Sequence, residues 1–82
     1  MATMGALVFV NILEGASPIE VARGIKELNG VKEVMLVSGQ WDLVVKFDYE
    51  KMGELSDFVV SKLRKVDGVG KTDTNIILDQ LE

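Results

Sequence analysis

The sequence predicts an α+β fold whose elements follow the order βαββαβ. Apolar runs of strand length alternate with two segments that carry apolar residues at helical spacing. Leu28-Asn29-Gly30-Val31 and Val66-Asp67-Gly68-Val69 resemble each other, and each closes a helical segment and opens a strand. The chain therefore divides into two β-α-β halves. This pattern predicts the ferredoxin-like arrangement, a four-stranded antiparallel sheet with both helices on one face.

The first half is expected to contain a strand, a helix and a second strand. Residues 6–13 are almost continuously apolar and β-branched, which is typical of a strand buried on both faces. Ser17 is the expected N-cap of a helix that begins with proline, and Glu20 completes a capping box. The helix is expected to end near Gly30, because glycine tolerates left-handed backbone. Residues 31–37 then form the second strand.

The second half is expected to begin with a hairpin. Three small or polar residues, Ser38-Gly39-Gln40, separate two apolar runs and place glycine where unusual backbone angles are needed. The third strand is expected over residues 41–47, followed by Asp48 as the N-cap of a helix over residues 50–65. The apolar stripe of that helix is Met52, Leu55, Phe58, Val59 and Leu63. The last strand, residues 69–78, alternates and is more polar, which favours a sheet edge.

The composition argues against several classes of function. A chain of 82 residues forms one small domain with a marginal core. It contains no cysteine and no histidine, so disulfides are excluded and most familiar metal sites and general bases are missing. We therefore expect no catalytic residue, no metal and no cofactor. The net charge of −4 argues against direct nucleic-acid binding. The absence of a membrane-length apolar run favours a cytoplasmic protein.

The two central strands predict self-association. Two helices cover only one face of a four-stranded sheet, yet the first and third strands carry apolar residues on both faces. Large exposed apolar surfaces mark interfaces. A second copy packed sheet against sheet, as in a dimeric α+β barrel, is the simplest cover, and a sheet partly open to water is less favoured. We expect the dimer contact at Val8, Val10, Ile12 and Val44.

Asp42 is the unusual residue of the hairpin, because it lies at the start of a mostly apolar strand. A carboxylate there is costly unless it is solvated or paired. It caps the turn by accepting hydrogen bonds from nearby backbone N–H groups, or it faces a small cationic ligand. Spacing alone favours the cap.

Two segments resemble one known family. Val37-Ser38-Gly39-Gln40-Trp41-Asp42 resembles the Gly-x-x-Asp turn in the effector domain of the Lrp/AsnC (feast/famine) regulators. Residues 68–78 look like the closing strand of that family, which starts Gly-Val and carries Thr-x-Thr before an apolar end. Full-length members carry an N-terminal winged helix-turn-helix, for which this chain has no room. It therefore resembles the stand-alone effector modules called RAM (regulation of amino acid metabolism) domains, and we expect residues 1–82 to form a single such domain.

The resemblance implies an amino-acid-binding regulatory module. Such modules dimerise sheet to sheet, the dimers assemble into rings, and a small amino acid binds between dimers. By resemblance, the backbone of Gly39, Gln40 and Trp41 would hold the ligand carboxylate and Asp42 the ammonium group. A neighbouring subunit would line the site with Thr72, Thr74 and Ile76. The family thus favours the ligand role of Asp42, although its second oxygen can still accept a backbone N–H.

The resemblance also implies partners and competing functions. The module would regulate transcription or amino-acid metabolism through assembly with itself or with full-length regulators, without contacting DNA. One alternative is a small enzyme of the dimeric α+β barrel class, such as an oxygenase or isomerase, although that class commonly uses histidine or a cofactor. Another is an ACT-like regulatory module or a purely structural oligomer.

Overall fold

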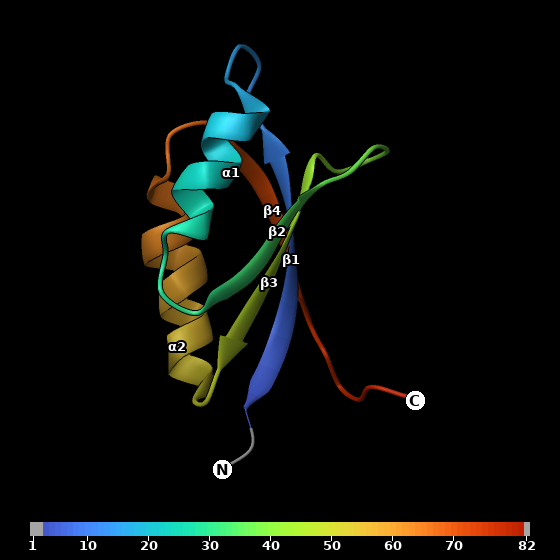
Figure 1. Ribbon diagram of the computed structural model, residues 1–82. Coiled ribbons are helices and arrows are strands. Elements are labelled where there is room, and N and C mark those ends of the chain that lie inside the picture. Colours follow the sequence, from blue (N-terminus) through green and yellow to red (C-terminus); the bar gives the residue numbers. More distant parts are fainter. Residues whose placement is uncertain (1–2, 82) are drawn as a thin grey trace.

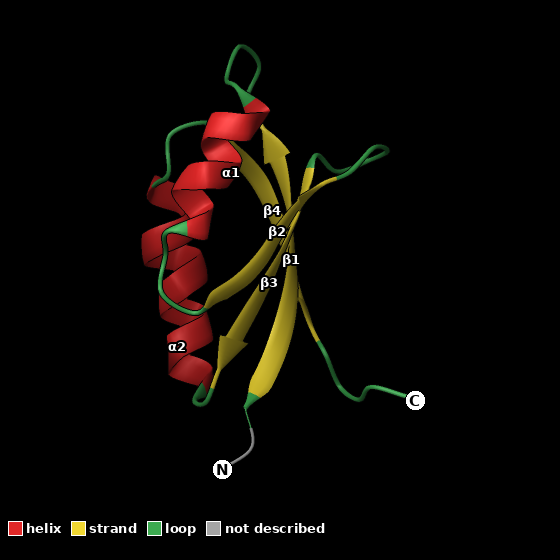
Figure 2. Ribbon diagram, viewed as in Figure 1, coloured by secondary structure: helices red, strands yellow, loops and turns green. Residues whose placement is uncertain are grey.

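The computed structural model describes residues 3–81 and confirms the predicted ferredoxin-like fold. Figures 1 and 2 show one layer of helix covering one face of a twisted sheet. The regular elements are β1 (Met4–Ile12), α1 (Pro18–Lys26), β2 (Val31–Leu36), β3 (Leu43–Tyr49), α2 (Met52–Asp57) and β4 (Val69–Ile76). The strands run antiparallel in the order β2-β3-β1-β4, so β1 and β3 are central and the last strand lies at an edge, as expected.

The start of α1 and the turn after it follow the sequence signals. Ser17 is the N-cap, and its Oγ accepts a hydrogen bond from the Glu20 N–H at 3.3 Å. Gly30 has φ of 91°. A Cβ at this position would collide with the Phe47 ring and lie 3.1 Å from the Asp48 carbonyl oxygen. Gly30 is therefore required both by its backbone angle and by the close approach of β3.

The second helical segment differs from the single helix that we expected. Only Met52–Asp57 is α-helical, and it is followed by a π-helical turn, Phe58–Lys62, and a 3₁₀ turn, Leu63–Lys65. A π turn spaces backbone hydrogen bonds five residues apart. Leu63, at the start of the 3₁₀ turn, is 0% exposed and belongs to the core, as the predicted apolar stripe requires.

Asp48 is not the N-cap of this segment, so that expectation is wrong. It lies within β3, where its Oδ1 is 3.2 Å from the Lys46 Nζ. The first turn is instead satisfied by Glu54, whose Oε1 accepts hydrogen bonds from the backbone N–H groups of Glu50 at 2.8 Å and Lys51 at 3.4 Å. These two bonds favour the charged form and lower the pKa of Glu54.

The core lies between the sheet and the helices. It contains Ala6, Val8, Val10, Val21, Ala22, Ile25, Leu43, Val45, Phe47, Tyr49, Leu55, Phe58 and Leu63. Even-numbered residues of β1 and odd-numbered residues of β3 therefore face the helices, as the period of two in a strand requires.

This alternation corrects the predicted dimer contact. Val8 and Val10 are 0% exposed within a single chain and belong to its own core, so their assignment to an interface is wrong. Ile12 also packs against that core. Val44 alone lies on the opposite face, since it is paired with Phe9 across the β1–β3 register.

The face away from the helices carries an apolar centre with a polar surround. We call the apolar centre the outer patch, and it consists of Leu7, Phe9, Met35, Trp41 and Val44. The charged or amide residues that share this face are Glu33, Lys46, Asp48, Asp73 and Asn75. In the part of the chain that the structure describes, no helix has the length and apolar character needed to cross a membrane.

Candidate functional site

The β2–β3 turn, residues 37–42, extends beyond the sheet on the side away from the helices (Figure 1). The Val37 N–H donates to the Asp42 carbonyl oxygen at 3.0 Å and closes the turn. Gly39 has φ of 121°, as the sequence predicted, and a Cβ there would meet no atom within 4 Å. Glycine is thus needed here for its backbone angle and not for space.

Asp42 connects this turn to the end of β1 through two hydrogen bonds. Its N–H donates to the Val10 carbonyl oxygen at 3.0 Å, and its Oδ2 accepts a hydrogen bond from the Ile12 N–H at 2.7 Å. The β1–β3 ladder ends where Val10 pairs with Leu43. The Ile12 N–H, the next donor on that edge of β1, therefore lies beyond the ladder, and the Asp42 carboxylate supplies its acceptor. Asp42 therefore caps a strand 30 residues away rather than its own turn.

The remaining polar groups of the turn have no hydrogen-bond partner among the described residues. Asp42 is exposed, and within residues 3–81 its Oδ1 accepts no hydrogen bond. The backbone N–H groups of Ser38, Gly39, Gln40 and Trp41 likewise donate to no acceptor among the described residues. A set of free N–H donors beside a free carboxylate oxygen is complementary to an α-amino acid, which carries a carboxylate and an ammonium group.

Trp41 joins the turn to the outer patch. Its ring centroid is 6.2 Å from that of Phe9, with the two planes tilted by 52°. The Trp41 side chain is half-buried by this contact. Sequence reasoning missed Phe9 as part of this surface, although its odd position in the first strand distinguished it from Val8 and Val10.

Thr72, Thr74 and Ile76 lie away from the turn in the same chain. They are paired with Val10, Val8 and Ala6, so they share the helix-facing side of the sheet. Thr74 contributes to a shallow groove of about 250 Å³ between β4 and the second helical segment, which is lined also by Met52, Leu55, Ser56, Val59 and Val60. One chain does not bring the two predicted halves of the ligand site together.

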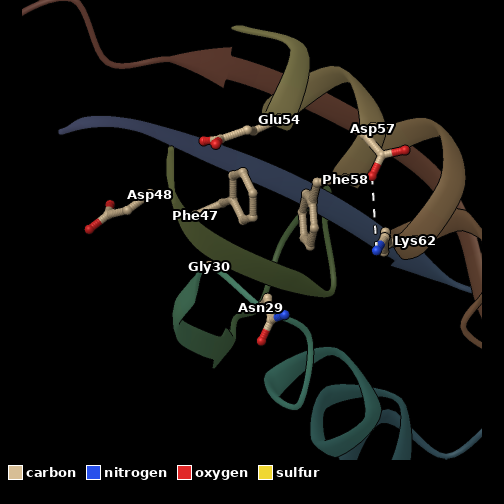
Figure 3. Close-up of a pocket in the computed structure, with 8 residues that line it drawn as sticks. All are labelled: Asn29, Gly30, Phe47, Asp48, Glu54, Asp57, Phe58 and Lys62. Atoms are coloured by element: carbon tan, nitrogen blue, oxygen red, sulfur yellow. Dashed lines mark ion pairs between the residues drawn. The ribbon is translucent and has the colours of Figure 1, made fainter. Parts of the chain in front are cut away.

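A second cavity, of about 320 Å³, lies where the α1–β2 loop meets β3 and α2 (Figure 3). It is lined by Asn29, Gly30, Phe47, Asp48, Glu54, Asp57, Phe58 and Lys62. The Phe47 and Phe58 rings stack with centroids 4.0 Å apart.

The acidic groups of this cavity already have partners. The Asp57 Oδ2 lies 3.9 Å from the Lys62 Nζ, and Asp48 pairs with Lys46. Glu54 accepts its two backbone hydrogen bonds. Among residues 3–81 no cluster of three or more side chains suits a metal ion. The β2–β3 turn is therefore the stronger candidate site.

Comparison with known proteins gives one family. A family model for the Lrp/AsnC ligand binding domain matches residues 5–82. An uncharacterised HTH-type transcriptional regulator of Pyrococcus horikoshii is 42% identical over 62 residues, which are 76% of this chain and 41% of that protein. A homocitrate synthase of Saccharolobus islandicus is 33% identical over 76 residues, which are 93% of this chain and 16% of the enzyme. The chain thus spans about two fifths of the regulator and a smaller part of the enzyme.

Solved structures share the fold. A protein of Thermus thermophilus has a TM-score of 0.87 and 28% identity, and the match covers 96% of this chain and 98% of the other. A transcriptional regulator of Neisseria meningitidis, crystallised with L-methionine, also has a TM-score of 0.87. Its identity is 20%, and the match covers 96% of this chain and 52% of the regulator.

Proposed function

Because this chain belongs to the Lrp/AsnC ligand-binding domain family, we propose that it binds a small amino acid and regulates through assembly. The observation that carries the proposal is the open turn, with free N–H donors at Gly39, Gln40 and Trp41 and one free oxygen on Asp42. In this arrangement the donors bind the ligand carboxylate, and the Asp42 Oδ1 binds its ammonium group. Each charge-assisted hydrogen bond contributes about 1.5–3 kcal/mol.

A second subunit completes the site in this proposal. Thr72, Thr74 and Ile76 face the helix side of their own sheet, so they reach the ligand only from a neighbouring molecule. Rings of dimers would bring these two regions together. L-methionine is the first ligand to test, because the regulator of the same fold from Neisseria meningitidis was crystallised with it.

The dimer in this proposal forms through the outer patch. Phe9 and Val44 are half-buried and lie at its centre, while Met35 is 40% exposed at its margin. An apolar centre with a polar rim is the usual composition of a protein interface. Val44→Lys places a charge at this centre and should abolish the dimer. Asn75→Lys, on the rim of the same face, is the matched control.

Residues 1–82 act in this proposal as a single cytoplasmic effector module that does not contact DNA and is not an enzyme. Two sources of regulation are supported by the relatives. Mixed assembly with full-length regulators is favoured by similarity to HTH-type regulators. Regulation of an enzyme by an amino acid bound to such a domain is favoured by similarity to part of a homocitrate synthase.

Thermal denaturation with each of the twenty amino acids tests ligand binding. A ligand at about 100 times its Kd stabilises the folded state by about 2.7 kcal/mol. For a domain of this size that raises Tm by roughly 10–20 °C. A folded, assembled protein whose Tm responds to none of the twenty amino acids would contradict the proposal.

A further inference from the structure

The tail after β4 carries two leucines that contact almost nothing. Leu78 is 93% exposed and Leu81 is 89% exposed, far above the other exposed apolar residues of the described chain. Exposing two large apolar side chains so fully is unfavourable unless they bury against another molecule.

Contacts of Ile77 with Gly5 hold the start of this tail against β1 and set the direction in which it leaves the sheet. The Ile77 N–H donates to the Gly5 carbonyl oxygen at 2.9 Å. The Ile77 side chain lies over Gly5, since a Cβ at that glycine would be 3.2 Å from the Ile77 Cδ1. From there the tail leaves the body on the side of the sheet opposite the helices (Figure 1). The β2–β3 turn extends on the same side at the other end of the sheet.

The outer face alone is small for a stable dimer. Nine residues of β1 at about 3.4 Å each, and four strands about 4.8 Å apart, outline at most roughly 600 Å². Stable interfaces bury about 800 Å² on each partner. Part of the available face is also polar, because Lys46, Asp48 and Asp73 share it. Apolar surface from outside the sheet would enlarge this interface.

We propose that residues 77–81 form an arm that crosses onto a second copy of the chain, where Leu78 and Leu81 pack against the margin of the partner's outer patch. This inference rests on the proposed dimer. A two-fold interface uses the same surfaces on both molecules, so each dimer has two arms and buries four leucines. The tail lies on the side of the sheet where that second copy would dock.

The test replaces the two leucines and measures the dimer. Leu78→Ser combined with Leu81→Ser should raise the dimer dissociation constant at least about a hundredfold in sedimentation equilibrium. The fold should persist in the monomer, because these side chains make almost no contacts within their own chain. Asp79→Ser combined with Gln80→Ser changes the same tail without removing apolar surface, and should leave the constant within about twofold. An unchanged constant in the leucine variant would overturn the arm.

Hydrogen exchange separates the arm from the dimer itself. The amides of residues 78–81 should be protected in the wild-type dimer and should exchange freely in Val44→Lys, which is monomeric if the outer patch is the interface. Equal exchange in both proteins would refute the arm even when Val44→Lys dissociates, and the proposed dimer would stand. A wild-type protein that sediments only as a 9.0 kDa monomer would refute both. The amino-acid screen does not depend on the arm, but it presupposes an assembled protein, because the proposed ligand site is completed by a second subunit.

Discussion

Replacing Asp42 by asparagine separates its two roles, because the carboxylate uses one oxygen for the fold and offers the other to a ligand. The Oδ2 bond to the Ile12 N–H, at 2.7 Å, is charge-assisted in the wild type. Asparagine retains an oxygen acceptor but loses the charge. The difference between a charged and a neutral hydrogen bond is about 1 kcal/mol, so Asp42→Asn should lower the ligand-free Tm by roughly 4–8 °C.

The same substitution should weaken amino-acid binding more than it weakens the fold. Loss of the charge opposite the ligand ammonium removes about 1.5–3 kcal/mol, which is roughly a tenfold to a hundredfold rise in Kd. Calorimetry below the Tm of the variant measures this. Asp42→Ala, which leaves the Ile12 N–H without its acceptor, should lower Tm further. Wild-type affinity in Asp42→Asn would refute the ligand role and leave Asp42 as a strand cap only.

Three other predictions concern the fold, its pH dependence and nucleic acid. Gly30→Ala should cost about 1–3 kcal/mol by thermal denaturation, since its φ of 91° and the Phe47 ring both oppose a Cβ. Gly53→Ala, in open space on α2, is the control and should stabilise by up to about 1 kcal/mol. The lowered pKa of Glu54 means that its contribution is present above pH 4.5 and is lost as the pH falls through the folded value, so Glu54→Gln should flatten the acid side of the Tm profile. Band shifts should detect no salt-sensitive DNA binding by a chain of net charge −4.

The sequence was sufficient for the element order, the Ser17 cap, the glycine at the hairpin and the edge position of β4. It did not determine which face of the sheet lies under the helices. Alternation separates Val8 and Val10 from Phe9, but both sets are apolar, so hydrophobicity alone does not say which one lies under the helices. Packing against the helices decides this, since Val8 and Val10 are buried there, and the β1–β3 register places Val44 with Phe9 on the other face.

Two further features depended on contacts that spacing does not reveal. Asp42 bonds to a strand 30 residues away, beyond the end of the β1–β3 ladder, and the sequence carries no evident signal for this contact. The helical stripe correctly placed Leu55, Phe58 and Leu63 in the core, but its spacing did not reveal the π turn of Phe58–Lys62. The predicted ligand residues lie on the β2–β3 turn and on the helix-facing side of β4, and one chain does not bring them together.

The contact between Trp41 and Phe9 gives the protein an intrinsic optical reporter. Trp41 is the only tryptophan, and its indole is half-buried where the open turn meets the outer patch. Indole emission depends on local polarity. A partner that excludes water from this surface should therefore shift the Trp41 emission to shorter wavelength. Occupation of the turn changes the surroundings of the same ring. One unlabelled chromophore therefore follows assembly on dilution and ligand titration at constant protein concentration, and the two signals are separated by varying one concentration at a time.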